Sequence, residues 1–94
     1  MNQNIQVKMD DQTLKGVYAN MMQVAHNREE FVLDFMNVLP PTGSVTARVV
    51  VSPGHLKRIV KALTENLKRY EDSFGQIREA DAPASAFGFE SKPN

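Results

Sequence analysis

The 94-residue sequence contains no cysteine and no tryptophan. Without cysteine there is neither a disulfide framework nor a thiolate for a metal or redox site. The formal net charge is zero, from 11 basic and 11 acidic residues, so the whole molecule has no general attraction to nucleic acid or anionic lipid. Apolar runs are far shorter than the roughly 20 residues of a membrane-spanning helix, and the N-terminus does not resemble a signal peptide. We therefore expect a soluble, cytoplasmic protein without a membrane partner.

The clearest pattern in the chain predicts one amphipathic helix from Ser52 to Gly75. Ser52 is a favourable N-cap, because its hydroxyl can accept from a free backbone N–H of the first turn. Pro53 suits the first helical position, and Gly75 suits the left-handed conformation that ends a helix. These signals define both ends of the helix.

One side of this predicted helix carries an apolar stripe. Most of its residues follow one another in steps of three and four, which is the spacing of a coiled-coil seam. The stripe consists of Leu56, Ile59, Val60, Leu63, Leu67, Tyr70 and Phe74. Two interpretations remain open: the stripe covers the sheet of its own chain, which we favour, or it contacts a second copy.

Alternating apolar residues predict four strands before the helix. They span residues 5–9, 15–25, 30–39 and 45–51, and the second of them also has a composition that suits a helix. In the third strand Phe31, Leu33 and Phe35 form one face. The other face carries Val32, Asp34, Met36 and Val38. Both faces are mostly apolar, which is unusual for a sheet with one side in water.

These elements predict an α+β fold, in which an antiparallel meander of about four strands is covered on one face by the long C-terminal helix. Residues 5–75 would form the domain, between a flexible N-terminus (1–4) and a disordered tail (76–94). One helix covers only one face of a sheet, so we expect a two-fold homodimer to cover the other. The predicted interface comprises Met22, Val24, Val32, Met36 and Val38.

Residues that could carry chemistry are few. The histidines, His26 and His55, lack the spacing of a zinc motif, and we expect neither a metal nor another cofactor. Asp34 is the best candidate for a carboxylate with a perturbed pKa, and Arg48 on the neighbouring strand is its expected partner. The chain has no nucleophile elbow, phosphate-binding glycine loop or pair of catalytic acids. We therefore expect no enzyme activity.

Two features suggest binding partners instead. Arg48, Lys57, Arg58 and Lys61 form a candidate patch for an anionic partner, which could contact nucleic-acid phosphates without sequence specificity. The zero net charge and the lack of a nucleic-acid-binding motif make this the less favoured interpretation. In the tail, Phe87 and Phe89 form a candidate docking motif for a protein partner.

Three blocks of the sequence resemble the small prokaryotic family catalogued as domain of unknown function 3467. They are residues 16–20 (GVYAN), 30–35 (EFVLDF) and 51–58 (VSPGHLKR), and the likeness extends over about residues 5–77. The resemblance implies a stand-alone domain and carries no activity. The order of strands before a long helix is also similar to that of the bacterial export chaperone, which is an analogy of layout only. The leading expectation is a non-catalytic, adaptor or chaperone-like interaction module.

Overall fold

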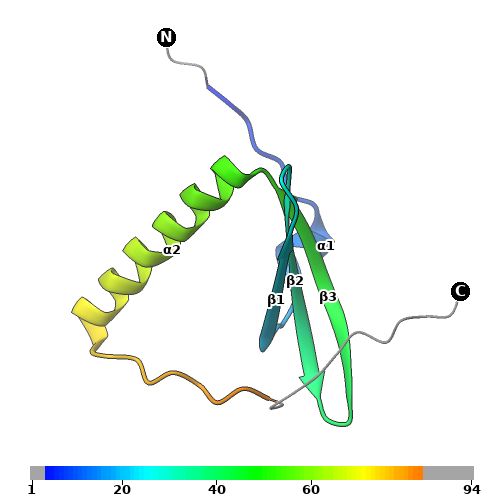
Figure 1. Cartoon of the computed structure of the whole chain (residues 1–94). Coiled ribbons are helices and arrows are strands. Elements are labelled where there is room, and N and C mark those ends of the chain that lie inside the picture. The colour runs from blue at the N-terminus through cyan, green and yellow to red at the C-terminus, as the bar shows by residue number, and fades with distance from the viewer. Residues whose placement is uncertain (1–3, 84–94) are drawn as a thin grey trace, which may run out of the picture.

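The computed structural model describes residues 4–83 of the chain. These residues form an α+β unit with a three-stranded antiparallel sheet, in which the central strand β2 lies between β1 and β3 (Figure 1). The elements are α1 (Asp11–Lys15), β1 (Met21–His26), β2 (Phe31–Leu39), β3 (Thr42–Val51) and α2 (Pro53–Phe74). The fold class is confirmed. The number of strands is three rather than four.

The first predicted strand is wrong. Residues 5–9 alternate in polarity, but they pair with no other strand, and the apolar side chains of Ile5 and Val7 are exposed. The following acidic residues begin the short helix α1, because the Asp10 carboxylate accepts a hydrogen bond of 2.7 Å from the backbone N–H of Thr13. Gly16, with φ of 74°, ends this helix.

The second predicted strand is shorter than expected, because residues before Met21 do not join the sheet. Asn20, directly before β1, makes the hydrogen bonds to β2 at this edge. Its backbone N–H donates to the Met36 carbonyl at 2.9 Å. Its side-chain amide accepts from the Val38 N–H at 2.8 Å and donates to the Val38 carbonyl at 3.0 Å. The Asn20 side chain therefore provides the hydrogen-bond partners of Val38 that a longer β1 would have provided.

The two turns of the meander lie close to their predicted positions. In the turn between β1 and β2, the side chain of Asn27 accepts from the backbone N–H groups of Glu29 and Glu30, each at 2.8 Å. Such an asparagine closes a tight turn with its own side chain. Pro40 and Pro41 form the turn between β2 and β3. β3 begins at Thr42, three residues earlier than predicted.

The ends of α2 are as predicted. The Ser52 hydroxyl accepts from the backbone N–H of His55 at 3.1 Å, and Pro53 is the first helical residue. Gly75 follows Phe74 with φ of 100°, and its N–H donates to the Glu71 carbonyl at 2.9 Å. Both caps thus satisfy backbone groups that a helix end leaves without a partner.

The prediction that α2 covers the sheet of its own chain is wrong. α2 starts at the end of β3 and runs away from the sheet (Figure 1). Among the described residues, the extensive contacts between elements are those of β2 with β1 and with β3. The buried residues, Leu33, Asp34, Met36 and Val38, all belong to β2. The core of the single chain is therefore one strand flanked by its two neighbours, and not a two-layer sandwich.

Candidate functional site

The strand register divides the sheet into two faces, because directly paired residues of antiparallel strands share a face. We call them the Leu33 face and the Asp34 face. The Leu33 face contains two fully apolar rows, Val24–Leu33–Val49 and Met22–Phe35–Ala47. The Asp34 face contains the polar row Gln23–Asp34–Arg48 between apolar neighbours. The two apolar rows of the Leu33 face are adjacent, whereas on the Asp34 face the polar row separates the apolar rows Ala25–Val32–Val50 and Met21–Met36–Val45.

This register corrects the predicted interface. Met22 and Val24 pair with Phe35 and Leu33, so they lie on the opposite face from Val32, Met36 and Val38. The prediction treated the five as one surface, because it placed the strands without knowing which residues are opposite one another. Met36 and Val38 are moreover buried within the single chain and have little surface left for a partner. The interface role of the other three remains a prediction.

The apolar stripe of α2 is uncovered over most of its length. Leu56 and Ile59, in the first two turns, are half-buried. Farther along, Leu63 is 65% exposed and Phe74 is 76% exposed. Tyr70 and Phe74 pack against each other with tilted rings, whose centroids are 4.9 Å apart, and against no other aromatic ring in the described part of the chain. The stripe therefore loses its cover as α2 leaves the sheet.

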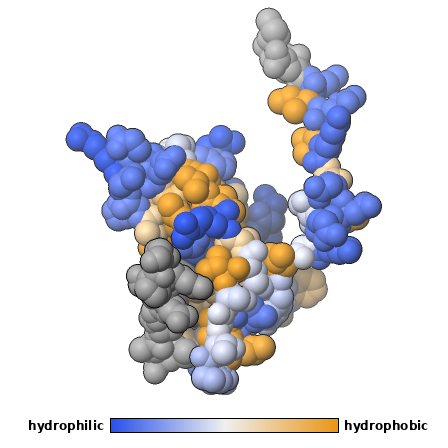
Figure 2. Space-filling model, turned by 90° about the vertical axis from the view of Figure 1, so that its right-hand side faces the viewer, coloured by the Kyte–Doolittle hydropathy of each residue, from blue (hydrophilic) through white to orange (hydrophobic). Residues whose placement is uncertain are grey.

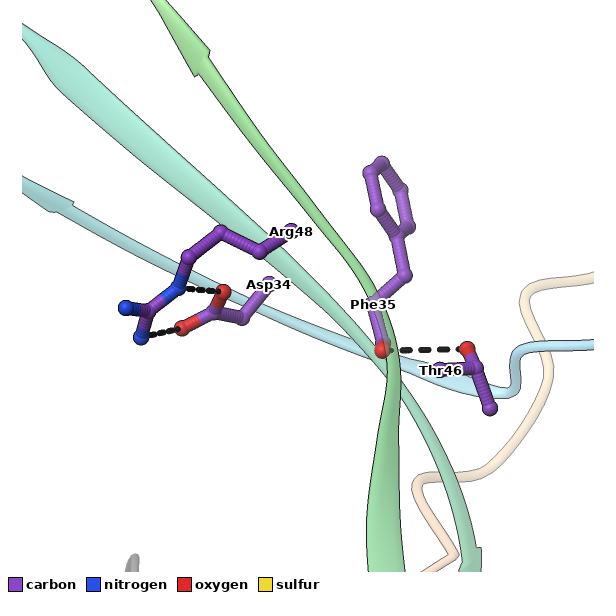
Figure 3. Close-up of polar contacts among 4 residues, drawn as sticks. All are labelled: Asp34, Phe35, Thr46 and Arg48. Atoms are coloured by element: carbon purple, nitrogen blue, oxygen red, sulfur yellow. Dashed lines mark hydrogen bonds and ion pairs between the residues drawn. The ribbon is translucent and has the colours of Figure 1, made fainter.

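Asp34 and Arg48 form the polar centre of the Asp34 face, as the sequence predicted. The Arg48 Nε donates to Asp34 Oδ1 at 2.7 Å, and its Nη2 donates to Oδ2 at 2.9 Å (Figure 3). The Asp34 side chain is buried, while that of Arg48 is mostly exposed. A bidentate pair of this kind is short and directional. Hydrogen bonds from Arg48 lower the pKa of Asp34, and they outweigh the opposite effect of its burial.

A β-bulge lies next to this pair. Phe35 pairs with Ala47 and Met36 with Val45, so Thr46 has no partner residue on β2. The Thr46 hydroxyl donates instead to the Phe35 carbonyl at 3.1 Å (Figure 3). A bulge increases the local twist of the sheet. The extra residue also shifts the register of β3 by one position, which puts Arg48 opposite Asp34.

The predicted basic patch is not one surface. Arg48 lies on β3 and its guanidinium is occupied by Asp34, whereas Lys57, Arg58 and Lys61 lie on α2. Two of these helical residues help to line an open depression beside α2. It is lined by His55, Arg58, Ile59, Lys61, Ala62 and Glu65. The depression therefore combines cations with an acid and apolar atoms, which is not a purely basic phosphate site.

The remaining candidates are the two histidines and the two phenylalanines of the tail. His26 packs against Phe31, with ring centroids 5.0 Å apart, and His55 donates its backbone N–H to the helix cap. Residues 4–83 contain no group of three or more His, Asp or Glu side chains that could hold a metal ion. Phe87 and Phe89 lie outside the described residues, and so does most of the predicted tail.

Apolar and hydrophilic groups are mixed on the side of the molecule that lies away from α2. Figure 2 shows apolar side chains there beside a hydrophilic cluster. No helix in the described part of the chain is long and apolar enough to cross a membrane. Exposed apolar side chains of the described residues lie on the stripe of α2, on the sheet and in the segment before β1.

The fold defines a small α+β protein with a three-stranded antiparallel meander and one long C-terminal helix. The chain belongs to the family described as "Protein of unknown function (DUF3467)", whose match covers residues 1–79. This confirms the resemblance found in the sequence. No curated protein and no solved structure matches the chain.

Proposed function

We propose that the protein is a non-catalytic protein-interaction module that works as a homodimer in the cytoplasm, in an adaptor or chaperone-like role. The observation that carries the proposal is the pair of uncovered apolar surfaces, the Leu33 face of the sheet and the stripe of α2. Monomeric proteins rarely leave large connected apolar patches in water. A second copy supplies both surfaces again, so it can cover each with the other.

The accessible area of the chain supports this proposal. It exposes 8850 Å², whereas a compact monomer of 10.5 kDa exposes about 5,400 Å². Segments outside the helices and strands account for part of the difference. A standard protein interface needs only about 800 Å² from each partner. An interface of that size would therefore cover part of the additional surface.

The polar groups support a non-catalytic role. The hydrogen bonds between Asp34 and Arg48 lower the pKa of the Asp34 carboxyl and raise the pKa of the Arg48 guanidinium. The pKa of Asp10 is lowered by the Thr13 N–H that it caps. Each of these shifts has a structural cause within one hydrogen-bonded pair. None arises in a cleft between two acids or between an acid and a nucleophile, where catalytic groups are usually tuned.

Light scattering coupled to size-exclusion chromatography tests the proposal. We expect the wild-type chain to elute with twice its own mass. The variant Leu63→Gln/Leu67→Gln removes two apolar residues from the stripe and should give monomer or unfolded protein. The matched control Glu65→Gln/Arg69→Gln places the same side chains on the polar side of α2, leaves the net charge unchanged and should stay dimeric. A wild-type chain that stays monomeric at every concentration would disprove the homodimer.

A second candidate function is sequence-nonspecific binding of nucleic acid. It is favoured by one observation, the exposed cluster of Lys57, Arg58 and Lys61 on α2, for which no ion pair is formed among the described residues. A dimer would carry this cluster twice. The ultraviolet spectrum of protein purified at low salt tests it, because a chain with two tyrosines and no tryptophan absorbs weakly at 280 nm. An excess at 260 nm that high salt and Lys57→Glu/Lys61→Glu both remove would favour this function.

A further inference from the structure

We infer that the two copies of the dimer exchange their helices, so that α2 of each chain packs on the Leu33 face of the other. The inference rests on the homodimer proposed above and adds which surfaces meet. It follows from the connection between β3 and α2, from the fit of the two apolar surfaces and from the symmetry of the pairing.

The connection between β3 and α2 sets the direction in which the helix leaves the sheet. A single residue, Ser52, separates Val51 from Pro53. A residue before proline is restricted to extended backbone, and Ser52 has φ of −71° and ψ of 157°. Its hydroxyl is also bound to the His55 N–H, which fixes the first turn of α2. With this short, extended junction, α2 runs away from its own sheet (Figure 1).

The two surfaces match in chemistry. The apolar part of the Leu33 face lies along Ala47–Val51 of β3, and the next row of that face is the polar pair Asn37–Ser44, so it can cover part of the 22-residue helix. The stripe of α2 carries no charge along its length, which suits the two fully apolar rows of the Leu33 face. The Asp34 face is less suitable, because a helix lying across it would have to cover the Asp34–Arg48 pair. The cost of removing such charges from water disfavours that arrangement.

Symmetry favours exchange over the other ways of pairing two copies. A coiled coil between the two α2 helices would cover both stripes and leave both Leu33 faces in water. A contact between two sheets would do the reverse. Helix exchange makes two equal contacts related by a two-fold axis, and each contact covers one stripe and one face. A short connection between exchanged elements is itself a feature that favours swapping.

Engineered cysteines can test the exchange, because the natural chain contains none. Leu63→Cys places a thiol on the stripe of α2, and Val24→Cys places one on the Leu33 face. Chains with one substitution each, carrying different tags, are co-expressed and treated with a short bis-maleimide. Leu67→Cys is the second stripe position, and Lys61→Cys on the polar side of α2 is the control. The light-scattering mass of each variant is measured first.

Helix exchange predicts a covalent product that carries both tags when the stripe cysteine is used, and little of it with Lys61→Cys. In a chain that holds both Leu63→Cys and Val24→Cys, the link should again join two chains. If that chain instead links to itself and still scatters light as a dimer, exchange is wrong while the homodimer stands. Links only between two Leu63→Cys positions would indicate a coiled coil and also overturn the exchange. A monomeric mass overturns both proposals.

Discussion

Strand β2 and helix α2 carry the two most regular apolar patterns in the chain, and only one of them is covered. β2 lies between β1 and β3, the strands directly before and after it in the sequence, and it supplies every buried residue of the described chain. α2 has a continuous apolar stripe with defined ends, yet Leu63 in its middle is 65% exposed. Periodicity thus identifies the side of an element that avoids water, but it does not identify what covers that side.

The difference between β2 and α2 comes from what lies within reach of each. Tight turns at Asn27 and at Pro40–Pro41 bring β1 and β3 beside β2 at a small cost in chain entropy. The equally tight junction at Ser52 has the opposite effect, because it directs α2 away from the same sheet. Local sequence signals therefore complete the core of β2 and leave the stripe of α2 uncovered in its own chain.

The largest expected effect is on the face that we assign to the partner's helix. Val49 and Val50 are neighbours on β3, with 43% and 49% exposure, but they lie on the Leu33 face and the Asp34 face respectively. If α2 of the second copy covers the Leu33 face, Val49→Asp buries an unpaired charge and should abolish the dimer. Val50→Asp should leave most of it intact. Light scattering measures both, and equal behaviour of the two variants would contradict the assignment of the face.

A smaller effect is expected from shortening one side chain of α2. Leu63→Ala should destabilise the protein by about 2–3 kcal/mol, close to the cost of Leu33→Ala in the core, if the stripe is buried in the dimer. A leucine that stays in water would lose less than about 0.5 kcal/mol. Urea denaturation at several protein concentrations measures the change. The stability of a dimer, but not that of a monomer, should rise with concentration.

Much of this architecture could be predicted from sequence because its signals are local. Ser52, Pro53 and Gly75 define α2 through caps that need no distant partner. The alternation in β2 identified both of its faces, and the opposite charges of Asp34 and Arg48 indicated their pairing.

The failures concern contacts between elements. Residues 5–9 alternate like a strand but do not pair with an edge of the sheet, and α2 does not pack along the sheet of its own chain. The grouping of Met22 with Val32 failed because register depends on turn geometry, and one residue of slip changes the face. The role of Asn20 was missed because a side chain that replaces backbone pairing leaves no periodic signal.

The smallest expected effect is a difference in stability between two ion pairs, Asp34–Arg48 on the sheet and Lys68–Asp72 on α2. Because hydrogen bonds from Arg48 lower the pKa of Asp34 in the folded state, the carboxylate stabilises the fold above its ordinary pKa of about 3.9. This stabilisation should be lost as the pH falls from that value through the lower folded pKa. Asp34→Asn should therefore be less stable than the wild type at neutral pH, and the gap should close in acid. Urea midpoints measured from neutral pH to about pH 3 would show it.

Asp72→Asn is the control for this comparison. It removes the Lys68–Asp72 pair of α2, which joins the Lys68 Nζ to Asp72 Oδ2 at 2.9 Å with both side chains exposed. An exposed pair of this kind is screened by water and salt, so its loss should change the urea midpoint little at any pH. If Asp34→Asn followed the wild type across the whole pH range, the pair beside β2 would be as weak as the one on α2. The charged row of the Asp34 face would then no longer be a reason for the partner's helix to prefer the Leu33 face.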